Sequence, residues 1–219
     1  MDNSLQATNK LWAAALWLAG FTIFYNLIEG IVSVGYGGQE ESLTLFGFGV
    51  DSFIELLSGA GILAMVLRIR RNPDQHRSTF EQTALRITGS SFYILTIGLT
   101  VGALYSIFTN HKPESTLPGA IISGISILVM WALVMGKRQV GKALSSQAIL
   151  ADANCTMVCI YMSLVLLASS VVYQLTGFGL IDSIGAIGLA YFSFNEGREA
   201  FEKAESLEDT CGCACAADD

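Results

Sequence analysis

Five acidic residues lie within or at the ends of long apolar runs, where an ionised side chain is costly. They are Glu29, Asp51, Glu55, Asp152 and Asp182, whereas the rest of the 19 acidic residues fall in more polar stretches. An ionised carboxylate near the centre of a bilayer costs about 2.5–3.5 kcal/mol on insertion scales. Because the apolar runs contain no lysine or arginine, we expect a bound cation or protons to neutralise these carboxylates.

Two pairs of potential metal ligands share the spacing i, i+4. Asp51 and Glu55 are one helical turn apart, as are Cys155 and Cys159, and Asp152 lies on the same helical face as the cysteines. Carboxylate oxygen and thiolate sulfur form a zinc-like ligand set that would also accept cadmium or another soft divalent ion. Two facing helices could therefore build one four-coordinate site. The alternatives are protonated carboxyl groups that hydrogen-bond between helices, and cysteines that serve only as small packing residues.

Four other polar residues give weaker signals. Glu29 could contribute to the site or sit in water near the outer face, and Asp182 could bind a cation or cap the start of a helix. Asp74 and His76 form a possible second metal site in a polar loop. A solvated loop with one ordinary histidine is the simpler interpretation of that pair.

The last nine residues include a C-x-C-x-C sequence formed by Cys211, Cys213 and Cys215. Thiolates two residues apart in a flexible, reduced tail can close on one soft metal ion. The tail could therefore capture or sense metal, although lipidation or a tail without function would explain the same residues.

Long apolar runs must position all of these residues. Of the 219 residues, 52% are hydrophobic and only 14% are charged, and the mean hydropathy is +0.52, so the chain has too little polar surface for an ordinary soluble domain. The six runs are Leu11–Val34, Ser42–Leu67, Ile87–Phe108, Pro118–Met135, Ile149–Leu175 and Leu180–Phe194. Because about 20 apolar residues cross a bilayer, we predict an all-α polytopic membrane protein with six transmembrane helices, of which the last is the weakest.

The basic residues predict how these helices are oriented. Eleven of the 12 lysines and arginines fall before the first run, after the sixth, or in the connections that follow the second and fourth runs. Because cytoplasmic loops retain positive charge, both termini are predicted to be cytoplasmic. We expect a cytoplasmic N-terminus (1–10), a six-helix transmembrane domain (11–198) and an acidic, Cys-rich cytoplasmic tail (199–219) in which a short helix precedes disorder.

Charge and motifs argue against two other classes of protein. A net charge of −7 and a pI near 4.8 disfavour a protein that binds nucleic acid. The sequence has no Walker loop, dinucleotide fingerprint or H-E-x-x-H motif, so we expect neither an enzyme nor a resident cofactor.

Two segments carry a resemblance to a known family. Residues Ser42–Glu55, SLTLFGFGVDSFIE, resemble the second-helix signature of the cation diffusion facilitators, in which a Ser-Leu-x-Leu opening precedes two metal ligands; Asp51 and Glu55 match those positions. Residues Ala151–Cys159, ADANCTMVC, resemble the fifth-helix pattern Ala-Asp-x-x-His-x-x-x-Asp, with cysteine in place of both the histidine and the aspartate. The acidic residues of the first and sixth runs also match family positions.

The resemblance implies a short family member without the usual C-terminal cytoplasmic domain. It would export a divalent transition metal, with zinc as the first candidate, from the cytoplasm across an inner or plasma membrane, in exchange for protons and by alternating access. It would also form a homodimer near the third helix, where Gly98 and Gly102 form a G-x-x-x-G face; tight packing within one subunit is the alternative. The competing functions are a metal-binding sensor that moves no ions and a redox membrane protein that uses the paired cysteines as a dithiol.

Overall fold

The computed structural model describes residues 2–39, 43–71, 77–109, 117–176 and 180–215. These residues form six helices and no strand: α1 (Asp2–Gln39), α2 (Leu43–Arg71), α3 (Arg77–Thr109), α4 (Leu117–Ala143), α5 (Gln147–Thr176) and α6 (Leu180–Cys215). The predicted all-α fold with six helices is confirmed. Within the described residues, five of these helices, α1–α5, are long and apolar enough to cross a membrane.

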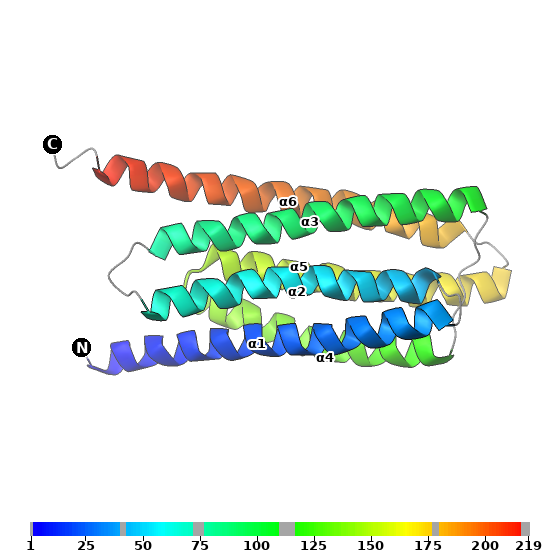
Figure 1. Cartoon of the computed structure of the whole chain (residues 1–219), viewed down its shortest axis with the longest axis horizontal. Helices are drawn as coiled ribbons and strands as arrows, with labels where there is room; N and C mark the ends of the chain where they lie inside the picture. Colours follow the sequence, from blue (N-terminus) through cyan, green and yellow to red (C-terminus); the bar gives the residue numbers. More distant parts are fainter. Residues whose placement is uncertain (1, 40–42, 72–76, 110–116, 177–179, 216–219) are drawn as a thin grey trace.

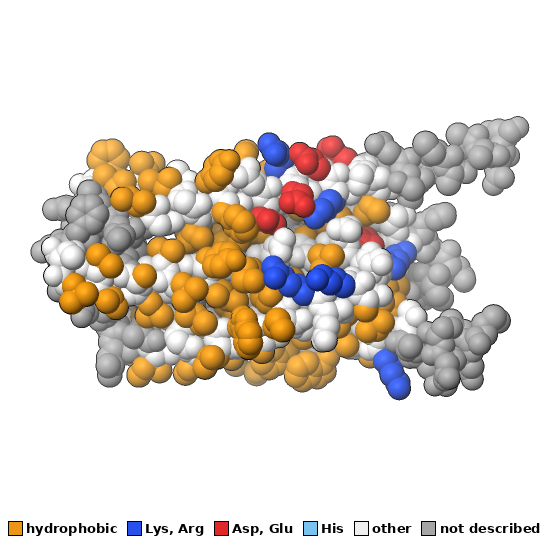
Figure 2. All heavy atoms as spheres, turned by 180° about the vertical axis from the view of Figure 1, so that it is seen from behind, with side chains coloured by type: hydrophobic (Ala, Val, Ile, Leu, Met, Phe, Trp, Pro, Cys, Tyr) orange, Lys and Arg blue, Asp and Glu red, His pale blue; other side chains and the backbone are white. Residues whose placement is uncertain are grey.

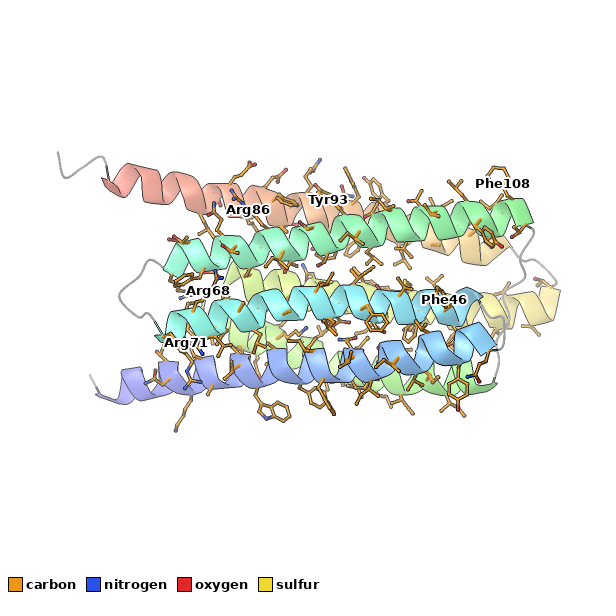
Figure 3. The ribbon with its side chains drawn as sticks, viewed as in Figure 1. Phe46, Arg68, Arg71, Arg86, Tyr93 and Phe108 are labelled. Atoms are coloured by element: carbon orange, nitrogen blue, oxygen red, sulfur yellow. The ribbon has the colours of Figure 1, made fainter. Side chains whose placement is uncertain are left out.

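The helices form one elongated bundle and run alternately in opposite directions (Figure 1). Both chain termini lie at the same end of the bundle, which we call the terminal end; the opposite end is the distal end. Figure 3 places Arg68, Arg71 and Arg86 toward the terminal end and Phe46 and Phe108 toward the distal end. In the face that Figure 2 shows, the charged side chains likewise lie in the half toward the terminal end, while hydrophobic side chains predominate in the described part of the other half. The charge asymmetry seen in the sequence therefore becomes an asymmetry between the two ends of the bundle.

Apolar side chains cover the outside of the bundle, and small polar side chains lie within it. Trp17 is 69% exposed and Phe108 is 84% exposed, whereas Asn26, Ser58 and Thr88 are fully buried. This pattern is the reverse of that in a soluble protein, and it suits a chain whose surroundings are lipid.

The helices extend beyond the apolar runs at the terminal end. Helix α4 continues through Ala143, so Lys137 and Arg138, which we expected in a connecting loop, are helical. The turn that follows is short, and Ser145 adopts a left-handed backbone conformation with a φ of 51°. Because the helix continues past its apolar run, Lys137 lies in the interior of the bundle and not in a connecting loop.

The segment from residue 199 was expected to be a short helix followed by disorder; a helix is present, and in the described part it continues further than expected. Helix α6 is continuous through Cys215. Ala200 and Ala204, one helical turn apart, are buried at 2% and 0% exposure, and the aromatic rings of Phe201 and Tyr93 stack between α6 and α3. Packing against α3 therefore extends the helix past the last apolar run.

Close approach of two helix pairs depends on glycine. A Cβ atom at Gly49 of α2 would lie 2.7 Å from the backbone nitrogen of Val34 on α1, and one at Gly89 of α3 would lie 2.8 Å from the ring of Phe201 on α6. A larger residue at Gly49 would meet the backbone of α1 and force α1 and α2 apart, whereas one at Gly89 would displace the ring of Phe201. The α1–α2 contact is the one that brings Glu29 of α1 beside Ser52 of α2, next to the predicted ligand Asp51.

Gly98 and Gly102 do not take part in such a contact. A Cβ atom at either position would meet nothing within 4 Å, and both residues are exposed on α3. Tight packing within one subunit is therefore not the role of this G-x-x-x-G face, and its contact with a second copy of the chain stays a prediction.

Candidate functional site

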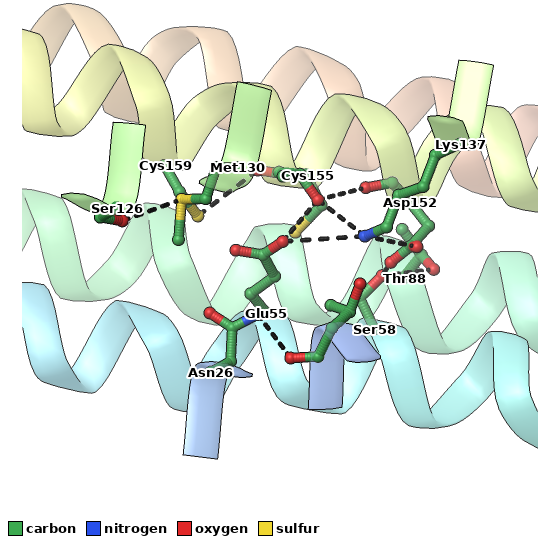
Figure 4. Close-up of polar contacts among 12 residues, drawn as sticks. Asn26, Glu55, Ser58, Thr88, Ser126, Met130, Lys137, Asp152, Cys155 and Cys159 are labelled. Atoms are coloured by element: carbon green, nitrogen blue, oxygen red, sulfur yellow. Dashed lines mark hydrogen bonds and ion pairs between the residues drawn. The ribbon is translucent and has the colours of Figure 1, made fainter. Parts of the chain in front are cut away.

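A buried lysine, which we expected in a connecting loop, lies at the centre of the polar interior. Lys137 is 1% exposed. Its Nζ lies 2.8 Å from Asp152 Oδ2 and 3.7 Å from Glu55 Oε1, and it donates a hydrogen bond of 2.8 Å to Thr156 Oγ1. Figure 4 shows these contacts among α2, α4 and α5. The expectation that no basic residue would neutralise the buried carboxylates is therefore wrong for Glu55 and Asp152.

The spacing of residues in α4 predicts that Lys137 is buried. Ser126, Met130, Val134 and Lys137 recur at helical spacing, and all four are buried at 0–1% exposure. Lys137 thus continues the inward-facing stripe of the helix two residues beyond the last apolar residue of the run. Because Lys137 follows the apolar run, it resembles a solvent-exposed charge at the end of a membrane span. Its helical spacing from Val134 and Met130 instead predicts that it faces the interior.

Asp152 has partners on both carboxylate oxygens. Oδ2 pairs with Lys137, and Oδ1 accepts a hydrogen bond of 2.7 Å from the hydroxyl of Ser58 on α2. Ser58 is in turn 3.0 Å from the hydroxyl of Thr88 on α3. The carboxylate therefore links α2, α4 and α5, with α3 joined through a hydroxyl, and its two oxygens are both engaged.

Only one of the two carboxylate oxygens of Glu55 has a hydrogen-bond partner. Its Oε1 accepts a hydrogen bond from the Thr156 hydroxyl and lies near the Lys137 ammonium. Its Oε2 is buried without a hydrogen-bond partner, as is Oδ1 of Asp51 one turn earlier on α2. Two carboxylate oxygens of the predicted pair are thus available inside the bundle.

The two thiols of α5 lie beside this carboxylate pair. Cys155 and Cys159 are free and buried. The Asp51 side chain lies against the Cys159 thiol, and Cys155 is close enough to Glu55 and Asp51 to interact electrostatically with both. The fold therefore brings α2 and α5 together along the faces that the sequence predicted.

These donors do not converge on a single point in this conformation. Within the described part of the chain, no three His, Cys, Asp or Glu side chains are arranged so that they could hold a metal ion. The structure thus brings the four predicted ligands into one neighbourhood without assembling them into a coordination sphere.

Glu29 is buried and not in water, contrary to one of the two interpretations of the sequence. It is 5% exposed and accepts hydrogen bonds of 3.1 Å from the Tyr25 hydroxyl and 2.9 Å from the Ser52 hydroxyl. Because Ser52 is next to Asp51 on α2, Glu29 belongs to the polar layer beside the candidate ligands.

For the remaining candidates, either the residue or its side chain lies outside the described part of the chain. Asp74 and His76 lie in the segment between α2 and α3 that the structure does not describe, and the side chains of Asp182, Cys211, Cys213 and Cys215 are likewise outside the described part. Their proposed roles stay predictions.

A cavity of ≈ 370 Å³ reaches Asp51 from the distal half of the bundle. Its lining comes from α2, α3, α5 and α6, and it includes Phe46, Asp51, Leu99, Met162 and Leu189. Phe46 marks its distal side (Figure 3). Asp51 is the one candidate ligand among the described residues that line this cavity, so it is the first carboxylate that an ion in the cavity would meet.

Comparison with known proteins agrees with this geometry. The family model described as "Cation efflux transmembrane domain" matches residues 16–207. The chain is also 28% identical over 163 residues to Transmembrane protein 163 of Xenopus laevis, an alignment that covers 73% of this chain and 56% of that protein. The chain thus spans a little over half of that relative's length. Since the family match includes all of the buried polar layer and more than half of the chain, this multi-pass membrane protein belongs to the cation efflux family of transporters.

Proposed function

We propose that this protein exports a divalent transition-metal cation, with zinc as the first candidate, in exchange for protons and by alternating access. The observation that carries the proposal is the pair of unpartnered carboxylate oxygens, Asp51 Oδ1 and Glu55 Oε2, buried beside two free thiols. A buried acceptor without a partner costs about 1–3 kcal/mol, and more when it is charged. A cation at this place would satisfy both oxygens at once.

The donor types favour a soft or borderline divalent ion. Asp51 and Glu55 supply oxygen, and Cys155 and Cys159 supply sulfur, which together form a set that suits zinc or cadmium better than magnesium or calcium. The four donors have to move closer together to coordinate one ion, because they do not converge in the present conformation. Rocking of helices between two access states would supply that movement.

Proton exchange follows from the same ligands. Carboxylates and thiols bind a metal ion only after they lose their protons, so binding of the cation releases protons and its departure allows protons to return. The cavity that leads to Asp51 gives such an ion, or the returning protons, a route on the distal side. We propose further that the functional unit is a homodimer.

Flux in proteoliposomes tests this function. The full chain is reconstituted with an internal zinc indicator and a pH gradient, and zinc uptake is compared with that of the double variant Asp51→Asn with Glu55→Gln. We expect the uptake by the double variant to fall to that of protein-free liposomes while its elution by size exclusion is unchanged. The matched control is Glu205→Gln, which alters an exposed carboxylate of α6 and should leave uptake as it is.

Two outcomes would count against the proposal. Zinc uptake retained by the double variant would remove Asp51 and Glu55 from the transport site. Zinc binding by the unaltered protein without any uptake would instead favour the alternative of a membrane sensor that uses the same donors.

A further inference from the structure

We propose that Lys137 is a built-in competitor for the transported cation, so that its ammonium group sets the affinity of the site and favours a divalent over a monovalent ion. This inference rests on the proposed function. Its starting point is the geometry of the ammonium, which is surrounded by two carboxylates and a hydroxyl, as a bound cation would be.

The ammonium and a metal ion would share one ligand. Oε1 of Glu55 accepts a hydrogen bond from Thr156 and lies near the ammonium of Lys137. Oε2 has no hydrogen-bond partner and is therefore the oxygen that could bind an ion beside Asp51. The two oxygens of a carboxylate are bonded to the same carbon, so the ion and the ammonium would face each other across a single side chain. Their repulsion is strong because the bundle interior screens charge poorly.

The two ion pairs of Lys137 differ in a way that allows displacement. Its Nζ lies 2.8 Å from Asp152 but 3.7 Å from Glu55. Asp152 therefore holds the ammonium, whereas the longer contact with Glu55 is the one that an arriving ion would break. The flexible stem of lysine lets the ammonium withdraw toward Asp152 without the loss of its closest partner.

Charge selection follows from this competition. A monovalent ion offers Glu55 no more charge than the ammonium already supplies, so it gains little from displacing it. A divalent ion offers twice that charge and also recruits Asp51 on the far side of Glu55. Lys137 thus acts on the cargo through Glu55, as a specificity-determining residue that is not itself a ligand.

Equilibrium zinc binding to the purified full chain in detergent tests the proposal. Lys137→Met removes the competing charge and keeps the apolar stem, so we expect zinc affinity to rise by about tenfold or more. Lys142→Met, which alters an exposed lysine of the same helix, should leave the affinity unchanged. The double variant Lys137→Met with Glu55→Gln should lose the gain, because the gain depends on Glu55.

A second pair of variants separates competition from a structural role and keeps the test valid if Lys137→Met fails to fold. Asp152→Asn frees the ammonium to pair fully with Glu55, so zinc affinity should fall. Lys137→Met combined with Asp152→Asn removes both members of the closest ion pair, so the affinity should again exceed that of the unaltered protein. If Asp152 were a metal ligand, this double variant would bind zinc weakly.

Zinc affinity that is unchanged or lower in a folded Lys137→Met protein and in the double variant overturns the proposal. Loss of the fold in both also overturns it, because it would assign Lys137 to holding the bundle together. Zinc uptake by the unaltered protein is measured in parallel. Absence of uptake would refute the proposed function, whereas normal uptake without the affinity gain would refute only the role of Lys137.

Discussion

Cys155 and Cys159 replace the histidine and aspartate that the matched pattern carries on the fifth helix, and this replacement bears directly on metal preference. Both thiols are buried beside Asp51 and Glu55. Sulfur is a softer donor than nitrogen or carboxylate oxygen and therefore favours cadmium over harder divalent ions. At the scale of single residues, the cysteine pair is thus the feature expected to set this chain apart from a transporter with the usual ligands.

The double variant Cys155→Ser with Cys159→Ser should lose cadmium uptake more than zinc uptake. Serine keeps the size of the side chain but offers a weak, neutral oxygen, so we expect the ratio of cadmium to zinc uptake to fall by about tenfold. A flux panel over zinc, cadmium, manganese and cobalt measures the change. The control is Ser163→Ala, which removes a buried hydroxyl one turn further along α5. An unchanged ratio in the cysteine variant would show that the thiols are packing residues.

At the scale of elements, a cluster at the terminal end fixes the turn between α4 and α5. Arg77 of α3 donates a hydrogen bond of 2.7 Å to the Leu144 carbonyl oxygen and lies 5.0 Å from the ring centroid of Trp12 on α1. Glu81 of α3 accepts hydrogen bonds from the Ser146 hydroxyl and, at 3.4 Å, from the backbone N–H of Ala148. A carboxylate of α3 therefore caps the start of α5, the helix that carries the two thiols.

Glu81→Gln should lower stability through this cap. An amide accepts hydrogen bonds less strongly than a carboxylate, and the substitution also removes the 3.5 Å ion pair with Arg77. We therefore expect the free energy of unfolding to fall by about 1–3 kcal/mol. Unfolding of the purified protein in mixed detergent measures the difference. The control variant is Glu205→Gln, which makes the same substitution at an exposed position of α6. Equal stability of the two variants would mean that the cap does not hold the turn.

The existence of the six helices follows from apolar run length alone, whereas the ends of the helices and the contacts in the site do not. The run Pro118–Met135 predicts α4, but the helix continues to Ala143 because Val140 packs into the buried interior. The spacing of Asp51 and Glu55 predicts a shared face, yet it contains no information on the rotation of α4. The partnership of Glu55 with Lys137 depends on that rotation, which is set by tertiary packing.

At the scale of the whole molecule, the two ends of the bundle differ in charge, and this difference predicts how the protein lies in a membrane. Arg68, Arg71 and Arg86 mark the terminal end (Figure 3). Because positively charged segments stay on the cytoplasmic side, we predict that the terminal end is cytoplasmic. The cavity that reaches Asp51 would then lie on the outer side of the candidate site, which is the side on which an exporter has to release its cation.

Two positions on α1 test this orientation as a matched pair. Lys10 and Gln39 are both exposed and belong to the same helix, and at 1.5 Å per residue they are about 44 Å apart, more than the roughly 30 Å of hydrocarbon. Each is changed to cysteine in a chain whose tail cysteines are replaced by serine. In intact cells, a membrane-impermeant maleimide should label Gln39→Cys and should label Lys10→Cys only after permeabilisation, because Lys10 faces the cytoplasm. The reverse labelling would place the basic end outside, and the cavity at Asp51 would then be an entry route for the cation.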